Sequence, residues 1–188
     1  GRKKAFMMES DAVYSVFPVR GGYAALTGKN GQITGFVLPE KKRRKAEKAA
    51  LALFPDARNS SPAFMRLAVK RIIRYFNGNR ENFSGIRICF EGIPDFGVKV
   101  LKAARKVAYG TVISYGKLAA LAGSPRASRA VGSALAVNPV PVLIPCHRII
   151  RSDKSIGGFS AGIKWKKTLL KIERGGKNAK SKKENDSQ

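Results

Sequence analysis

Residues that cross-link small folds or bind metals in them are scarce in this sequence. Its 188 residues include two cysteines, Cys89 and Cys146, and a single histidine, His147. Two cysteines are too few for the disulfide framework of a small secreted protein, and with one histidine they cannot complete an ordinary structural zinc site. We therefore expect free thiols in a reducing compartment, with neither a metal nor a cofactor.

Long apolar runs are also missing. No run approaches the roughly 18 apolar residues of a membrane-spanning helix, and Gly1-Arg2-Lys3-Lys4 lead into no apolar signal core. These absences predict a soluble, intracellular protein without a membrane partner. Because 44% of the residues are hydrophobic, the chain nevertheless has enough apolar surface for a packed core.

Acidic residues are few, since 12 Asp and Glu face 37 Lys and Arg, which gives a formal net charge of +25. Such an excess goes beyond what solubility requires and is typical of a chain that meets nucleic acid. Part of it lies in the run from Lys41 to Lys48. That run fits a phosphate-facing patch, but equally a solvated helix face or a localisation signal.

The first part of the chain predicts a small α/β unit. Three β-prone runs, Val13–Val19, Gly22–Thr27 and Gln32–Leu38, are separated by Gly-rich turns and indicate an antiparallel meander. Helical spacing follows in the segments ending at Phe54 and Phe76, and the second apolar stripe, which includes Tyr75, is interpreted as core. Ile86 to Phe90 is expected to be a short strand that buries Cys89.

From Pro94 onward the pattern becomes helical. A helix with Asp95 at its start is followed by two short helices, Tyr115–Ala122, opened by Ser114, and Arg126–Ala136. Two such helices joined by a tight turn are typical of a helix-turn-helix, although helical hairpins also serve as packing units. The second helix favours DNA because it combines cations with small residues that permit close approach, namely Arg126, Ala127, Ser128, Arg129 and Gly132.

The sequence predicts the reactive site at Cys146, which is followed directly by His147. A thiol and a neighbouring imidazole are the smallest set of groups that nucleophilic chemistry by a cysteine requires, and a cysteine hydrolase uses the same set. The nearby prolines stiffen an extended segment and keep Cys146 out of any long helix. A last helix, Ile163 to Glu173, places a carboxylate at its end against the helix dipole, so Glu173 is expected to have a specific partner, with His147 as the candidate.

Several of these motifs occur together and in order. Ile144-Pro145-Cys146-His147-Arg148, preceded by Asn138-Pro139-Val140 and followed by Gly157-Gly158-Phe159-Ser160, resembles the O6-alkylguanine-DNA alkyltransferases, over roughly Phe96 to Gly175. The N-terminal region resembles that family's ribonuclease-H-like domain only in element order. The resemblance implies an α/β (α+β) protein with a flexible basic N-terminus (1–10), a ribonuclease-H-like domain (11–93), a winged-helix-like domain with the helix-turn-helix (94–175) and a disordered basic tail (176–188).

The resemblance also implies an activity, that of a methylated-DNA–[protein]-cysteine S-methyltransferase. Cys146 would take the alkyl group from O6-alkylguanine, and from O4-alkylthymine, in a single irreversible turnover. His147 would accept the thiol proton through a water and Glu173 would orient the imidazole. Asn138 would tie the cysteine segment to the preceding helix, and Tyr115 would protonate or hydrogen-bond the departing guanine.

The same resemblance assigns DNA contacts. Arg129 would fill the place of a flipped base, and the helix that carries Ala127, Ser128 and Gly132 would enter the minor groove. Ser114 and Arg126 would be further DNA-binding residues. The guanine pocket would consist of Pro141, Ile149, Gly157, Phe159 and Ser160, with Phe159 standing where many relatives have tyrosine. Some members hold zinc in the N-terminal domain, but this chain lacks the ligands. The expected partner is double-stranded DNA containing O6-alkylguanine, bound by a monomer without an obligate protein partner. Its location would be the cytoplasm, at the nucleoid of a prokaryote, or the nucleus of a eukaryote.

Two other functions stay open. An alkyltransferase-like protein binds the lesion without transfer, although in such proteins the acceptor cysteine is replaced. A helix-turn-helix regulator could instead use Cys146 structurally or as a redox sensor.

Overall fold

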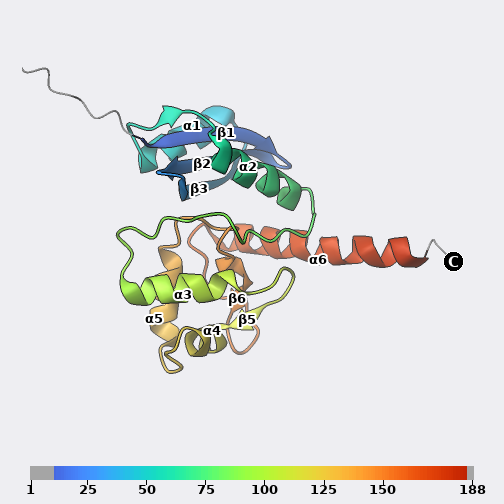
Figure 1. Cartoon of the computed structure of the whole chain (residues 1–188). Helices are drawn as coiled ribbons and strands as arrows, with labels where there is room; N and C mark the ends of the chain where they lie inside the picture. The colour runs from blue at the N-terminus through green and yellow to red at the C-terminus, as the bar shows by residue number, and fades with distance from the viewer. Residues whose placement is uncertain (1–10, 186–188) are drawn as a thin grey trace, which may run out of the picture.

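The computed structural model describes residues 11–185, and the first half is built on a four-stranded sheet of order β3-β2-β1-β4 (Figure 1). The predicted meander is confirmed: β1 (Val13–Val19), β2 (Gly22–Lys29) and β3 (Gln32–Glu40) pair antiparallel, and β4 (Arg58–Asn59) adds parallel to β1. The tight turn between β2 and β3 can form because Asn30 and Gly31 both adopt positive φ, 51° and 71°, which this residue pair tolerates.

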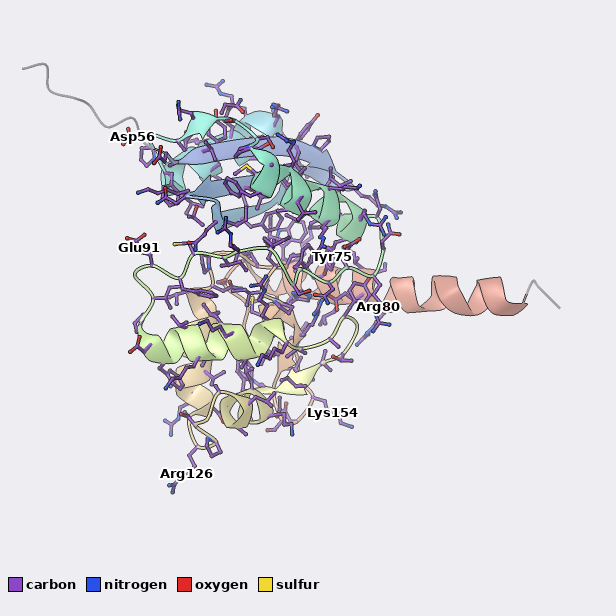
Figure 2. The ribbon with its side chains drawn as sticks, viewed as in Figure 1. Asp56, Tyr75, Arg80, Glu91, Arg126 and Lys154 are labelled. Carbon is purple, nitrogen blue, oxygen red and sulfur yellow. The ribbon has the colours of Figure 1, made fainter. Side chains whose placement is uncertain are left out.

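Two helices cover opposite faces of this sheet because its apolar side chains alternate. Tyr14 and Val16 share a cluster with the alanines of α1 (Arg43–Leu53), whereas Val13 and Phe17 share the main core with α2 (Ala63–Phe76). The cations at positions 41–45 are exposed. Figure 2 shows Asp56, just after α1, and Arg126, just before α5, at opposite ends of the molecule. The basic run therefore lies far from the helix-turn-helix.

The second half is mainly helical. α3 (Asp95–Arg105), α4 (Tyr115–Leu121) and α5 (Ser128–Ala136) pack on one another, and a parallel pair of two-residue strands, β5 (Ile113–Ser114) and β6 (Ile149–Ile150), lies beside α4. The Ser114 hydroxyl caps α4 by accepting a hydrogen bond from the Lys117 amide at 3.1 Å. The expected helix-turn-helix and the mixed α+β class are both present.

One hydrophobic core runs through both halves. It joins buried residues of β1 and β2 to those of α2, α3, α6 (Ile163–Asn185) and the segment before Cys146, including Leu26, Ile72, Leu101, Ile144 and Leu169. A backbone hydrogen bond of 2.9 Å from Phe36 of β3 to the Pro139 carbonyl also attaches the sheet to the segment leading to Cys146. The cysteine segment is therefore supported by the N-terminal half.

Two sequence expectations need correction. Ile86 to Phe90 is not a strand: it makes a single bridge, Ile33 with Ile88, because Pro139 already occupies the adjoining edge of β3 at Phe36. The last helix does not end at Glu173 but continues as α6 to Asn185, through the region expected to be disordered, and projects from the body (Figure 1). The added turns contain four lysines, which are good helix formers, although they begin with the poor helix formers Gly175 and Gly176. The flexible-terminus prediction for 1–10 and the last part of the predicted tail, 186–188, lie outside the described residues.

Candidate active site

Cys146 opens a single 3-10 turn, η1 (Cys146–Arg148), directly after Pro145. The position outside any long helix agrees with the prediction, but the backbone is a tight turn rather than extended. The side chain is only 5% exposed, yet it lines a cavity of about 840 Å³. The thiol is thus held at the base of a pocket large enough for a nucleobase and shielded from bulk water.

Asn138 fixes the cysteine segment to α5, which ends two residues earlier. Its amide nitrogen donates to the Ile144 carbonyl at 3.0 Å and to Cys146 Sγ at 3.1 Å, while its carbonyl accepts from the Val140 amide at 3.1 Å. Burial raises the pKa of Cys146, and the Asn138 hydrogen bond opposes that rise by stabilising the thiolate. The predicted tie between Asn138 and the cysteine segment is present.

His147 and Glu173 form the expected pair, with 2.6 Å between Nε2 and Oε1. Burial lowers the pKa of His147, so the imidazole is neutral near pH 7. An ionised Glu173 can only accept, which places the imidazole hydrogen on Nε2 and the lone pair on Nδ1. Nδ1 is buried and has no hydrogen-bond partner among the described residues. It is the atom free to accept a proton.

The Glu173 carboxylate is surrounded by donors. Besides His147 it accepts from Arg148 (Nη2 at 3.0 Å and Nε at 3.1 Å), the Gly110 amide at 2.8 Å and the Tyr75 hydroxyl at 2.9 Å. Burial alone would raise its pKa, but the hydrogen bonds and charges of His147 and Arg148 outweigh burial and lower it from 4.5 to about 2. Glu173 stays ionised. Because α6 continues past it, these donors, and not a helix end, explain its position.

The cavity brings Cys146 together with the DNA-binding helix predicted from the sequence. Of the predicted site residues, those lining it are Tyr115, Ser128, Arg129, Gly132, Phe159 and Ser160. The other predicted pocket and DNA-contact residues do not line it, namely Pro141, Ile149, Gly157, Ser114, Arg126 and Ala127. Gly157 has a φ of +67°, and a Cβ there would come within 3.0 Å of the Tyr115 ring. Gly157 therefore shapes the pocket by letting Tyr115 approach.

Sequence reasoning missed Lys166, whose side chain is fully buried beneath the pocket. Its ammonium donates to the Ile149 and Gly158 carbonyls and lies 5.8 Å from the centre of the Tyr115 ring. Burial lowers its pKa to about 8. The carbonyl of Ile149, one of the residues expected to form the guanine pocket, therefore already accepts a hydrogen bond. The available signal was spacing, because Lys166 shares a helix face with Leu169 and Glu173.

Sequence reasoning also missed the polar role of Tyr75. The residue is buried, as its place in the α2 apolar stripe predicts, but its hydroxyl contacts Glu173 and lies 3.3 Å from His147 Nε2. Among the side chains that the structure describes, no three His, Cys, Asp or Glu residues cluster as a metal site would require. Within residues 11–185, every helix is too short or too polar to span a membrane.

The helix-turn-helix lines one cavity with a buried thiol, and an imidazole–carboxylate pair begins at the residue after that thiol. This combination defines a class, that of DNA-binding proteins with a cysteine nucleophile. A family model described as "6-O-methylguanine DNA methyltransferase, DNA binding domain" matches residues 95–175. The methylated-DNA–protein-cysteine methyltransferase of Methanosarcina barkeri is 41% identical over 110 residues, which cover 58% of this chain and 68% of that protein. The chain belongs to the methylated-DNA–protein-cysteine methyltransferase family.

Two further relatives show how far the likeness extends. The Haemophilus influenzae protein of the same name is 42% identical over 110 residues, covering 58% of this chain but only 59% of that protein's length. The solved structure of Mycobacterium tuberculosis OGT in complex with DNA is 28% identical with a TM-score of 0.69, covering 87% of this chain and 93% of that one. Sequence likeness thus centres on the second half, whereas the fold likeness includes the first.

Cys146, His147 and Glu173 form a buried relay for the thiol proton, and its two ionisable partners, His147 and Glu173, make the stability of the folded state sensitive to acid. His147 has a lowered pKa in the folded protein, so unfolding takes up a proton once the pH falls below about 6.5. Glu173 also has a lowered pKa, and its contribution is complete above about 4.5 and lost as the pH approaches 2. We expect urea-unfolding free energies to decrease from pH 7 to pH 5, with a shallower decrease in His147→Gln. Equal slopes in the two proteins would contradict this assignment.

Proposed function

We propose that this protein repairs alkylated DNA by irreversible transfer of the alkyl group from O6 of guanine in duplex DNA to Cys146. The observation that carries the proposal is that the thiol and the exposed side chains of α5, Ser128 and Arg129, line one cavity. A base leaving the duplex beside α5 would enter the pocket that ends at the nucleophile. The family membership and the DNA complex of the Mycobacterium tuberculosis relative support the same function.

Proton transfer comes first in the mechanism. His147 accepts the Cys146 proton at Nδ1 through an intervening water, and Glu173 stabilises the imidazolium that results. The thiolate attacks the alkyl carbon, an S–C bond forms, the C–O bond breaks, and its electron pair leaves on guanine O6. Tyr115 lines the cavity, and because burial raises the pKa of its hydroxyl it remains a donor for the departing oxygen.

The product is a thioether, and none of these residues offers a route for removing the alkyl group from sulfur. Each molecule would therefore act once, unlike a cysteine hydrolase, which regenerates its thiol. O4-alkylthymine presents the same alkoxy group beside a ring nitrogen and is the second proposed substrate. Phe159 leaves the wall apolar where a tyrosine would add a hydroxyl. A monomer suffices for this chemistry, and it would act wherever the cell keeps its DNA.

Mass spectrometry tests the function directly. After mixing with a duplex that contains O6-methylguanine, the intact protein should gain one methyl group, and peptide mapping should place it on Cys146. An unmethylated duplex of the same sequence is the control. Lesion binding without a gain in mass would favour the alkyltransferase-like alternative, and binding to one sequence regardless of the lesion would favour the regulator.

Base flipping predicts a specific effect of Arg129→Ala. If the guanidinium occupies the vacated place in the duplex, its loss should slow repair in duplex DNA by about 10-fold or more, since unpairing a base takes a few kcal/mol. Reaction with free O6-benzylguanine, which needs no flipping, should change little. Arg126→Ala is the matched control: Arg126 is exposed and outside the cavity, so only duplex affinity should fall. Equal slowing of the two substrates by Arg129→Ala would exclude this role.

A further inference from the structure

One residue of the N-terminal half reaches the catalytic relay. Tyr75, in the last turn of α2, is fully buried, and Figure 2 shows it where the sheet half meets the helical half. Its hydroxyl lies 2.9 Å from Glu173 Oε1 and 3.3 Å from His147 Nε2. The other groups that donate to Glu173, from Gly110, His147 and Arg148, all belong to the second half.

The direction of the tyrosine hydrogen bond follows from the charges. Glu173 is ionised and can only accept, so Tyr75 donates to the same oxygen that accepts from His147 Nε2. The tyrosine ring cannot swing away, because Phe76, Phe83 and Tyr109 surround it at 5.4, 6.0 and 6.0 Å between ring centres. The hydroxyl is thus presented to the relay in one fixed position.

We propose that Tyr75 is a positioning residue of the transfer reaction, through which the N-terminal half holds Glu173 and limits the basicity of His147. The inference rests on the proposed function, because it assigns Tyr75 a part in proton transfer from Cys146. A donor on Oε1 withdraws negative charge from the oxygen that faces Nε2. Removing that donor would concentrate the charge on the imidazole side and strengthen the attraction for a proton on His147.

The remaining charges around His147 would be unchanged by such a substitution. Arg148 and Lys166 are the cations that disfavour its protonation, and Glu173 is the anion that favours it. Cys146 precedes it in the turn, and Tyr109 lies near Glu173. Any change in the pKa of His147 on loss of the Tyr75 hydroxyl would therefore come through Glu173.

The test compares Tyr75→Phe with Tyr109→Phe in the full chain. Both remove one hydroxyl from neighbouring rings of the same cluster, but the Tyr109 hydroxyl donates to the Ile172 carbonyl, at 3.4 Å, and not to the carboxylate. His147 is the only histidine of the sequence, so its NMR titration is free of overlap. The second measurement is the single-turnover rate of methyl transfer from lesion duplex as a function of pH.

We expect Tyr75→Phe to raise the pKa of His147, to move the acid limb of the rate profile upward by the same amount, and to lower the plateau rate by about 10-fold. The last figure is the loss of one hydrogen bond to a charged group, roughly 1.5 kcal/mol. Affinity for the lesion duplex should stay within about twofold. Tyr109→Phe should leave the His147 titration unchanged.

Three outcomes would overturn the inference. They are a His147 titration in Tyr75→Phe identical to wild type, the same shift in Tyr109→Phe, or an unfolded Tyr75→Phe, which would make the hydroxyl a requirement of the fold. Failure of the wild-type protein to take up methyl is a separate result: it would refute the proposed function, while the NMR comparison would still report on the contact.

Discussion

Replacing Cys146 with alanine is expected to abolish methyl uptake completely while leaving the protein folded and able to bind the lesion. The thiolate is the only group that the proposed mechanism uses as acceptor, so no residual transfer should remain. The structural change is small: Sγ loses the hydrogen bond from the Asn138 side chain, whose amide nitrogen keeps the Ile144 carbonyl as a partner. We expect a loss of stability of about 1 kcal/mol, typical of removing one buried atom.

The chain contains its own control for this experiment. Cys89 is a second free thiol, partly buried beside β3 and absent from the residues that line the cavity. Cys89→Ala should take up one methyl group at the wild-type rate. Methyl uptake by Cys146→Ala, or its loss in Cys89→Ala, would mean that the acceptor has been misassigned. Retained lesion binding in Cys146→Ala would also provide a trapped complex for structural work.

The relay could be predicted from the sequence because its parts have few alternatives. One histidine adjoins one of two cysteines, and the resemblance named Glu173 as their carboxylate. Asn138 came from the same motif, and the structure shows the hydrogen bonds that its assigned role requires. The parts of the site that depend on residue type and on short sequence spacing could therefore be predicted without a structure.

Contacts between segments that are far apart in the sequence could not be predicted in this way. Tyr75 lies 98 residues before Glu173, and its spacing in α2 predicts only that it is buried, not what its hydroxyl meets. Lys166 reads as one more cation in a basic helix until the fold buries it. The failed strand at Ile86 to Phe90 has the same origin, because the competing segment at Pro139 is far away in the sequence. The division into domains at residue 94 stays a prediction.

Glu173 shows why the two halves of the chain act together. Its carboxylate accepts from the N-terminal half through Tyr75 and from the C-terminal half through Gly110, His147 and Arg148. Arg148 is 5% exposed, so its guanidinium is nearly as deeply buried as the carboxylate. A buried cation of this kind is tolerated only while its partner remains ionised. The group that orients the catalytic imidazole is therefore also the counter-charge of the core.

Glu173→Gln is accordingly expected to impair both stability and transfer. The amide preserves the size of the side chain but removes the negative charge, and its NH₂ group must face at least one of the existing donors. Breaking a buried ion pair on one side should lower the free energy of unfolding by about 3–5 kcal/mol. Loss of the anion that stabilises protonated His147 should slow methyl transfer at pH 7 by about 100-fold or more. Urea unfolding and single-turnover kinetics measure the two effects.

Glu81→Gln provides the matched control, since Glu81 also pairs with an arginine, but Arg74 is 54% exposed, so this pair is open to solvent on the arginine side. Its removal should change the unfolding free energy by less than about 1 kcal/mol and leave transfer unaltered. If Glu173→Gln were as mild as Glu81→Gln, the dense set of donors around the carboxylate would have no energetic importance. If Glu173→Gln destabilised the protein but the molecules that remain folded transferred methyl at the wild-type rate, Glu173 would stabilise only the core. His147 would then accept the thiol proton without help from the carboxylate.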